Sequence, residues 1–374
     1  MPRDTRRPQT DKNKRRKENR PATLTEFFGQ EGALAQSMEG YELREEQLRV
    51  AQAIEQAMEE GKVCLAEAGT GVGKSLAYLV PAVRAAFQGK KTVISTHTIN
   101  LQNQLIDKDI PLVLSLFPDA EHRVFPVLMK GRGNYLCKLA LDNAHEDMFL
   151  VSDPLFHRVE KWSQKVYCTG DLAELPFTYP NWYELTSTPE TCRSQECKYY
   201  NSCHYYKVRF EAMESNLIVV NHALFLSDLA MRLSGEPNAG ILPQYDHVIF
   251  DEAHHLEEVA TKTFGLEFTS RRIGTLLDRI RHIRGLDIDK NRLQTLDDLA
   301  NNFFTPFLQA NRSEFYFSEV MEGDTQDAVE TQTGIACNSI SELQKELLEI
   351  AKTEEPLRER LEGIAKLCGR AREE

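Results

Sequence analysis

The sequence lacks any long run of apolar residues. Hydrophobic amino acids make up 41% of its 374 residues, but no stretch approaches the roughly 18 consecutive apolar residues that a membrane-spanning helix requires. The first residues are charged and have no apolar segment behind them, which argues against a secretory signal. We therefore expect no membrane partner and a cytoplasmic location.

The sequence also lacks an overall excess of basic residues, which a nucleic-acid-binding chain commonly has. Its formal net charge is -12. Basic residues are concentrated in residues 1–22, an arm with almost no apolar side chain, which predicts a disordered tail. This arm could be a loose phosphate-binding tether or a solubilising tail, and the sequence leaves both interpretations open.

Short apolar runs alternate with amphipathic stretches between about residues 40 and 130. This pattern is typical of parallel strands joined by crossover helices and predicts an α/β domain. The expected strands are residues 62–67, 91–96, 124–129, 216–220 and 247–250, and the expected helices lie near residues 45–60, 75–88 and 98–108.

Residues 130–210 interrupt this pattern. They are rich in Cys, Tyr, Asn and Pro and have little apolar periodicity, so they predict an insertion held by something other than a core of its own. The α/β domain would then comprise residues 23–129 and 211–262. From residue 263 to residue 374, apolar residues recur at spacings of three and four, which predicts helices.

The segment AGTGVGKS follows an expected strand and precedes an expected helix, where a phosphate-binding loop must lie. Its glycines let backbone N–H groups face phosphate, its lysine would bind the β- and γ-phosphates, and its serine hydroxyl would hold Mg²⁺. Alanine replaces the first glycine of the usual pattern. The expected ATP-binding residues are Ala68, Gly69, Thr70, Gly71, Gly73, Lys74 and Ser75.

The segment VIFDEAH places two carboxylates at the end of an apolar strand, where open parallel sheets bind ligands. Asp251 is suited to hold Mg²⁺, and Glu252 is suited to be the base that orients and deprotonates the attacking water. Together with Lys74 they form the predicted catalytic set. The alternative is a solvated acidic helix start, which the upstream P-loop makes less favoured.

These motifs resemble those of superfamily 2 helicases. The segment YELREEQ is similar to the adenine-contacting element of that family, with Gln47 as the expected base reader. Residues 95–105 are similar to a segment that holds single-stranded DNA, which implies DNA contacts at Thr96, Thr98 and Gln102. Taken alone, these three residues are better explained as a capped helix start after a strand.

The cysteines of the insertion indicate a subgroup. Cys137 follows KGRGNYL, and Cys192, Cys197 and Cys203 are spaced C-x4-C-x5-C. With the downstream segment VVNHALF, this arrangement resembles the XPD/DinG helicases, and the resemblance implies that four thiolates hold a [4Fe-4S] cluster. A four-cysteine zinc site is the open alternative, although its usual C-x2-C pairs are missing. Cys168 is a fifth candidate that the family pattern leaves out.

Basic and aromatic residues alternate around the insertion, and such a mixture suits single-stranded nucleic acid. The residues are Lys130, Arg132, Tyr135, Tyr199, Tyr200, Tyr205, Tyr206 and Lys207, of which the first three are the predicted DNA contacts. The alternative is that about half of the aromatic rings pack around the cluster.

The resemblance implies a RecA-like motor domain interrupted by an iron-sulfur insertion and followed by a helical arch-like domain. It also implies an ATP-dependent helicase that moves 5′ to 3′ on single-stranded DNA and acts at single-strand to double-strand junctions in repair or replication. We find neither the family's Ser/Thr-Ala-Thr motif nor its second motor domain, so we expect ATP and DNA binding without unwinding. The alternative is a binding module or a redox-responsive iron-sulfur protein.

Overall fold

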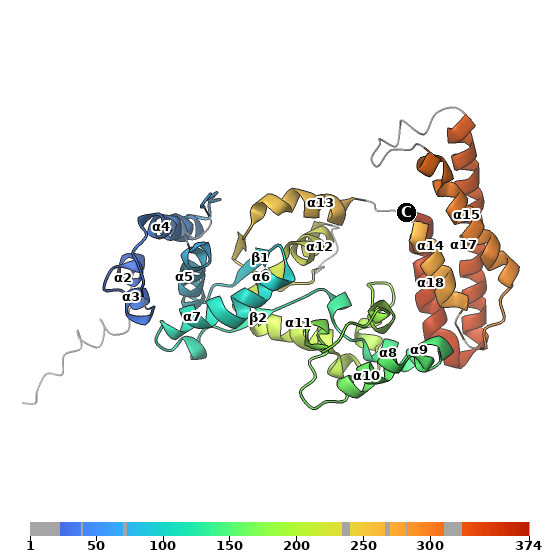
Figure 1. The fold of residues 1–374 in the computed structure, drawn as a ribbon, viewed down its shortest axis with the longest axis horizontal. Coiled ribbons are helices and arrows are strands. Elements are labelled where there is room, and N and C mark those ends of the chain that lie inside the picture. The colour runs from blue at the N-terminus through green and yellow to red at the C-terminus, as the bar shows by residue number, and fades with distance from the viewer. Residues whose placement is uncertain are drawn as a thin grey trace, which may run out of the picture. The chain divides into compact units, whose positions relative to one another are not determined.

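The computed structural model describes residues 23–38, 40–69, 73–233, 240–265, 270–281, 283, 285–309 and 324–373. The chain forms two compact units, one comprising Met1–Lys130 and Val208–Val259 and the other Gly131–Lys207 and Ala260–Glu374 (Figure 1). The insertion therefore shares a unit with the helical region. The predicted basic tail, residues 1–22, lies outside the described residues.

Within its described residues, the first unit is built on a four-stranded parallel sheet with the strand order β2-β3-β1-β4. The strands are β1 (Thr92–Thr96), β2 (Pro126–Leu128), β3 (Leu217–Asn221) and β4 (His247–Phe250). In the register, Ile94 lies opposite Val219 on one side and Ile249 on the other. Parallel neighbours need crossover connections, so the predicted α/β class is confirmed.

The two inner strands explain why their sequences read as continuous apolar runs. All five residues of β1 are buried, as are the first four of β3. A parallel strand covered on both faces has no solvent side, so it does not alternate between apolar and polar residues. The outer strand β4 is more exposed, with Val248 37% accessible.

The first unit also contains helices that pack on this sheet or on one another. They are α2 (Leu24–Phe28), α3 (Ala33–Ser37), α4 (Glu45–Glu60), α5 (Lys74–Phe87), α6 (Ile99–Gln104), α7 (Ile110–Ser115), α11 (His204–Glu214, shared with the second unit), α12 (His222–Leu233) and α13 (Leu256–Phe264, also shared). A π-helical turn, Leu105–Asp109, joins α6 to α7. Phe27 and Phe28 of α2 and Leu79 of α5 are fully or almost fully buried and share one core with Ile94.

The predicted strand at residues 62–67 is wrong. In the structure this segment belongs to no sheet, and Val63 and Leu65 are 89% and 94% exposed. Alternating apolar residues favour an extended backbone, but a strand forms only where a neighbouring strand takes its hydrogen bonds. The pattern in the sequence says nothing about that neighbour.

The insertion has a small core of its own, contrary to the expectation from its weak periodicity. Its helices are α8 (Lys138–Ala144), α9 (Met148–Ser152) and α10 (Pro154–Ser163). Trp162 and Trp182 meet edge to face with ring centroids 6.3 Å apart, and Phe156 and Leu185 are fully buried beside them. Aromatic side chains bury a large area each, so a few of them form a core without regular spacing.

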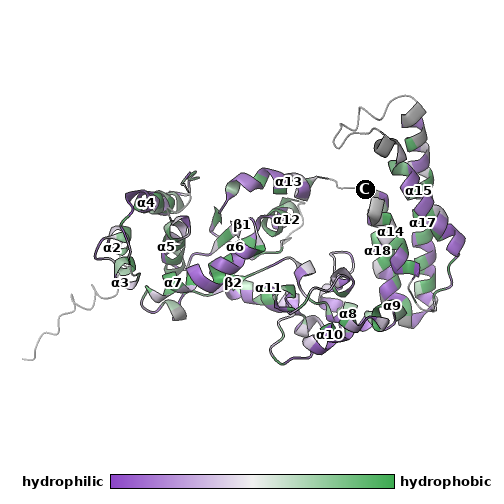
Figure 2. Ribbon diagram, viewed as in Figure 1, coloured by the Kyte–Doolittle hydropathy of each residue, from purple (hydrophilic) through white to green (hydrophobic). Residues whose placement is uncertain are grey.

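The described part of residues 263–374 is helical, as the apolar spacing predicts. It contains α14 (Ser270–Arg281), α15 (Lys290–Gln309), α17 (Asp324–Thr353) and α18 (Arg358–Glu373). Figure 2 shows apolar and polar residues on different faces of these helices. The apolar faces meet in a second core around Leu277, Leu343, Leu347 and Leu361. No helix in the described parts of the chain is both long and apolar enough to cross a bilayer.

Candidate active site

The predicted phosphate-binding loop is described on both of its sides. Ala68 and Gly69 lie in an irregular segment, with Gly69 exposed. Thr70 and Gly71 lie outside the described residues. The chain resumes at Gly73, which directly precedes helix α5.

Lys74 and Ser75 open helix α5, so their backbone amides belong to its first turn, where anions are stabilised. Gly73 has a φ of 80°, in the left-handed region that favours glycine. A Cβ at Gly73 would also collide with the Gln47 side chain. The backbone conformation therefore favours glycine, and any other residue would also have to displace the end of the Gln47 side chain.

Gln47 contacts the backbone of the phosphate-binding loop. Its side chain is buried, and Nε2 donates to the carbonyl oxygen of Gly73 at 2.8 Å. The sequence predicts contact with the adenine base. The structure places the amide against the loop backbone, where it fixes the residue that precedes helix α5.

The structure brings the two predicted catalytic motifs together. Lys74 Nζ donates to Glu252 Oε1 at 3.0 Å. This hydrogen bond is the main reason that the pKa of Glu252 is lowered. The expected phosphate-binding cation therefore lies next to the expected base.

Asp251 lies deeper than Glu252. Its backbone N–H donates to the Ser95 carbonyl at 2.8 Å, which extends the contact between β4 and β1. Thr96 Oγ1 donates to Asp251 Oδ2 at 3.5 Å. Burial raises the pKa of Asp251, the charge of Glu252 raises it further, and Lys74 opposes the change. The two neighbouring carboxyl groups thus have pKa values shifted in opposite directions.

Glu252 has an unusual backbone conformation. Its φ of 56° and ψ of 44° lie in the left-handed region, which a non-glycine residue rarely occupies. Such a conformation costs on the order of 1–3 kcal/mol and is concentrated at functional sites. The sharp turn ends the strand segment and begins the helical turn Ala253–His255.

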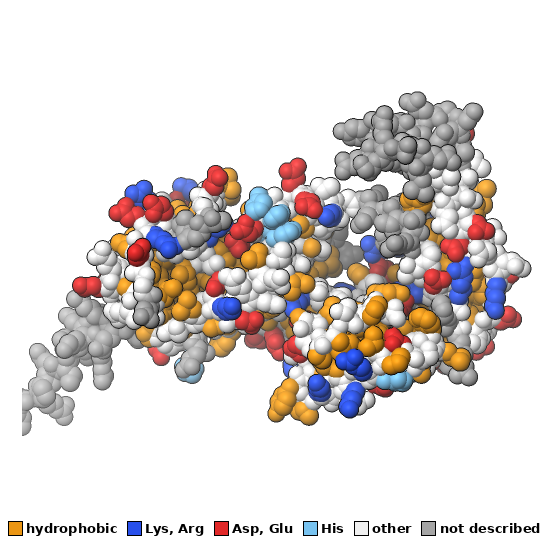
Figure 3. Space-filling model, in the orientation of Figure 1, with side chains coloured by type: hydrophobic (Ala, Val, Ile, Leu, Met, Phe, Trp, Pro, Cys, Tyr) orange, Lys and Arg blue, Asp and Glu red, His pale blue; other side chains and the backbone are white. Residues whose placement is uncertain are grey.

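Histidines surround this turn, and the sequence did not identify them as site residues. His222 is fully buried at the start of α12, and its Nδ1 lies 2.7 Å from Ser95 Oγ. The ring of His255 stacks on His97 at 3.8 Å and lies 4.1 Å from His254. Figure 3 shows histidines gathered beside acidic side chains on the surface. In the sequence, His222 lies in the segment VVNHALF, which resembles a segment of the XPD/DinG helicases, and this resemblance is the one feature that points to it.

The predicted DNA contacts after β1 have different environments. Thr98 is exposed and caps helix α6, accepting a hydrogen bond from the Leu101 backbone N–H at 3.2 Å. Thr96 and Gln102 are both 0% exposed. The capped helix start therefore accounts for Thr98, and the other two side chains are not available to a DNA strand in this conformation.

The contacts predicted around the insertion are also largely covered. Lys130 and Tyr135 are each 3% exposed, while Arg132 is half-buried. The guanidinium of Arg132 lies over the ring of Tyr205, 5.0 Å from its centroid. Tyr205 and Tyr206 are buried, so these two rings pack in the interior. That such rings surround a cluster stays a prediction.

Two of the predicted cluster ligands lie at helix starts. Cys137 immediately precedes α8, and its sulfur accepts hydrogen bonds from the backbone N–H groups of Ala140 and Leu139. Cys203 immediately precedes α11 and accepts from the first turn of that helix in the same way. Hydrogen bonds and helix N-termini stabilise a thiolate.

The four predicted ligands influence one another electrostatically. Burial raises the pKa of Cys137 to about 11, and the thiols of Cys203 and Cys192 contribute to the rise. Burial also raises the pKa of Cys203, with contributions from Cys192 and Cys197. Across the described residues, no three His, Cys, Asp or Glu side chains lie close enough together to hold one metal ion.

Cys168 has the environment of a core residue. It packs against the apolar cluster of the insertion. Burial is the main cause of its raised pKa, and Glu174 is the largest charge that raises it further. That Cys168 is not a ligand stays a prediction.

A parallel sheet whose DEAH carboxylates meet a P-loop lysine defines the motor domain of a DEAD/DEAH-box helicase. Residues 49–110 match the family model described as DEAD/DEAH box helicase, and residues 186–273 match the DEAD_2 family. The ATP-dependent DNA helicase YoaA of Haemophilus influenzae is 36% identical over 282 residues, which are 74% of this chain and 43% of that protein.

The chain belongs to the XPD/DinG family of helicases. The ATP-dependent DNA helicase DinG of Salmonella choleraesuis is 28% identical over 338 residues, which are 83% of this chain and 45% of that protein. The chain thus spans less than half the length of these two relatives. A solved structure described as an XPD helicase aligns with a TM-score of 0.42 at 13% identity, covering 79% of this chain and 48% of that one.

Proposed function

We propose that this chain binds ATP with Mg²⁺ and forms the nucleotide-binding part of an ATP-dependent DNA helicase. The observation that carries the proposal is the 3.0 Å contact between Lys74 and Glu252, which joins two motifs 178 residues apart in the sequence. The relatives' names supply the substrates, ATP and DNA. The proposed location is the cytoplasm.

The oxygen donors at this site fit Mg²⁺. Asp251 is a half-buried carboxylate at the end of a strand segment, and Ser75 supplies a hydroxyl at the start of α5. Hard oxygen ligands of this kind suit Mg²⁺. When bound, Mg²⁺ would neutralise charge on the phosphates.

Lys74 would have two roles: it would bind the phosphates of ATP, and its movement would change the pKa of Glu252. In the structure its ammonium lowers the pKa of Glu252. Transfer of that ammonium to the terminal phosphates of ATP removes this influence, so the pKa of Glu252 rises towards the range in which a carboxylate is a better proton acceptor. Glu252 would then take the proton of the attacking water.

The test is ATP binding by Lys74→Ala, measured by titration with a fluorescent ATP analogue. Affinity should fall, because the lysine supplies the positive charge for the β- and γ-phosphates. Lys62→Ala is the matched control, since that residue is exposed and pairs with Glu60 at 2.7 Å, outside the site. Equal affinity in both variants would refute the P-loop assignment.

Single-stranded DNA is the proposed polynucleotide substrate, with junctions to double-stranded DNA, 5′ to 3′ movement, and a role in repair or replication as the finer proposals. Thr98 and Arg132 support it best, because each has an accessible side chain. Thr96, Gln102, Lys130 and Tyr135 are buried and would need a conformational change to reach a strand.

The same proposal includes a [4Fe-4S] cluster held by Cys137, Cys192, Cys197 and Cys203. The fit rests on the chemistry of the donor set: four thiols, at two of which backbone N–H groups point at the sulfur. Burial disfavours a free thiolate at Cys137, whereas metal coordination deprotonates it. When bound, the cluster would supply a cross-link between distant segments. A zinc ion on the same ligands is the competing assignment, and it would need these cysteines to move closer together, since among the described residues no three of them lie close enough to share one ion.

A further inference from the structure

In the second unit, helix α18 packs against the segment that carries Cys192. Arg193 Nη2 donates to Glu362 Oε2 at 2.8 Å. Arg370 donates to Glu190 on the other side of the cysteine. The two residues that bracket Cys192 in this way are therefore both held by the same helix.

A glycine of α18 allows the close approach between these two ion pairs. A Cβ built on Gly363 would lie 3.7 Å from Cγ2 of Thr191, which is ordinary van der Waals contact. Gly363 and Arg370 are seven residues apart, about two turns, so they lie on one face of the helix. A larger side chain at Gly363 would occupy the position of Thr191, the residue before Cys192.

The segment itself forms a tight turn. The Thr188 backbone N–H donates to Thr191 Oγ1 at 2.9 Å, and the Thr191 backbone N–H donates to Thr188 Oγ1 at 3.3 Å. The Cys192 backbone N–H then donates to the Thr188 carbonyl at 3.0 Å. This turn defines the local backbone at Cys192, but it makes no connection to the other three cysteines.

Those three cysteines are anchored inside the insertion. Cys137 and Cys203 lie at the starts of α8 and α11. Next to Cys197, Lys198 pairs with Asp142 of α8 at 2.8 Å, and Tyr199 donates to the same carboxylate. On the far side of Cys192, the Tyr206 hydroxyl donates to Ser194 at 2.8 Å.

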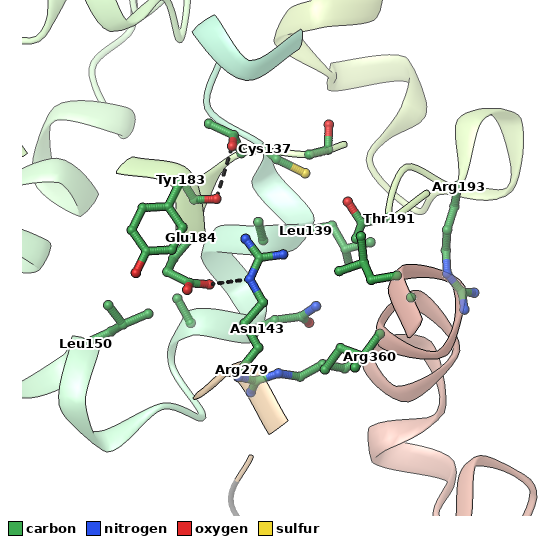
Figure 4. Close-up of a pocket in the computed structure, with 17 residues that line it drawn as sticks. Cys137, Leu139, Asn143, Leu150, Tyr183, Glu184, Thr191, Arg193, Arg279 and Arg360 are labelled. Atoms are coloured by element: carbon green, nitrogen blue, oxygen red, sulfur yellow. Dashed lines mark hydrogen bonds and ion pairs between the residues drawn. The ribbon is translucent and has the colours of Figure 1, made fainter. Parts of the chain in front are cut away.

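Cys192 is thus a predicted ligand whose segment is held by the helical region as well as by the insertion. Figure 4 shows Thr191 and Arg193 beside this helix, with Cys137 across the same cavity. We propose that helix α18 is a clamp that positions Cys192 for metal binding, so that retention of the cluster depends on the helical region as well as on the insertion. This inference rests on the proposed role of Cys192 as a ligand.

The first test compares two substitutions at Gly363. Gly363→Ala adds a methyl group that fits, and alanine favours a helix interior, so its cluster should be as stable as that of the parent chain. Gly363→Leu is equally compatible with a helix but collides with Thr191. Its cluster should be lost to an iron chelator faster by roughly fivefold or more, because overpacking displaces the segment that carries Cys192.

The second test exchanges charges. Arg193→Glu and Glu362→Arg should each accelerate cluster loss, because each places two like charges together, and the double exchange should restore the parent rate. The measurement is the anaerobic decay of absorbance near about 400 nm after addition of chelator, with circular dichroism to verify that every variant is folded. Parent-like decay in folded Gly363→Leu, or no recovery in the double exchange, would refute the clamp.

Metal analysis of the parent chain separates this inference from the cluster assignment. Iron and labile sulfide support both. If the parent contains zinc, the cluster assignment fails, and the same variants test the clamp through the rate of zinc release to a colorimetric chelator. A parent prepared without oxygen that contains neither metal refutes the clamp together with the cluster.

Discussion

At the scale of single residues, the two carboxylates of the DEAH box have separate tasks because their environments differ. Glu252 is paired with Lys74, whereas Asp251 is half-buried at the end of a strand segment, where burial raises its pKa. We predict that Glu252→Gln keeps ATP binding, because shape and hydrogen bonding persist, but slows hydrolysis by roughly 10² to 10⁴ through loss of the base. Asp251→Asn should instead weaken the dependence on Mg²⁺.

The measurement is steady-state ATP hydrolysis in a protein that contains both motor domains, with nucleotide affinity determined in parallel. Titration of Mg²⁺ distinguishes the two variants. Hydrolysis at the parent rate by Glu252→Gln would contradict the role of the base, whereas loss of ATP binding would point to a structural role for the pair with Lys74.

His222 lends itself to a prediction about stability. Its ring is fully buried and lies 2.7 Å from the Ser95 hydroxyl. Replacing it with phenylalanine leaves that hydroxyl buried without this partner, so the free energy of unfolding should fall by about 1–3 kcal/mol. The double variant Ser95→Ala, His222→Phe should lose less than the sum of the single losses, because both partners are then absent.

Urea denaturation of the four proteins, followed by circular dichroism, provides this comparison. His145→Phe is a matched control, because its side chain is 47% exposed and belongs to the other unit. Strictly additive losses at Ser95 and His222 would show that the contact contributes nothing of its own.

At the scale of elements, the sequence predicts those helices and strands that interactions between nearby residues determine. The buried runs at β1 and β3, the outer strand β4 and the helices α4 and α5 lie where the sequence predicts them within a residue or two. The segment 62–67 failed because strand pairing depends on a distant neighbour. The core of the insertion was missed for a related reason: Trp162 and Trp182 come from segments without regular spacing.

The residues of the candidate site likewise divide into those that local motifs predict and those that packing between elements positions. Lys74, Asp251 and Glu252 could be identified because each belongs to a motif whose spacing is local. The burial of Gln102 and the contact of Gln47 with the loop could not, because both result from packing between elements. His222 is an intermediate case. Its segment resembles one of the family's, but its partner, Ser95, lies on another strand, so the contact could not be predicted.

The insertion provides a prediction at this scale. Cys197 follows the helical turn Ser194–Glu196, whereas Cys168 packs in the apolar core. Cys197→Ser should abolish the absorbance near about 400 nm that cysteine-ligated iron gives, whereas Cys168→Ser should retain it. The measurement is the spectrum and the iron and sulfide content of protein purified without oxygen. If Cys168→Ser lost its colour and Cys197→Ser kept it, Cys168 would be the ligand and Cys197 would not.

At the scale of the whole molecule, ATP hydrolysis needs residues from more of the protein than ATP binding does. The chain spans 43% of YoaA and 45% of DinG. In P-loop motors an arginine from outside the nucleotide site contributes roughly 10³ to 10⁵ to the rate, so a site built only from Lys74, Asp251 and Glu252 should bind ATP and turn it over slowly.

We therefore predict that this chain alone binds ATP and single-stranded DNA, and that adding DNA changes its ATP hydrolysis little. A protein of the relatives' full length that carries the same residues should instead be strongly stimulated by DNA. The measurement is phosphate release with and without a single-stranded oligonucleotide, with Glu252→Gln as the blank. Strong stimulation of the short chain would mean that its own residues complete the catalytic site. No stimulation of the long protein would favour a binding module over a motor, because a motor must couple hydrolysis to the strand on which it moves.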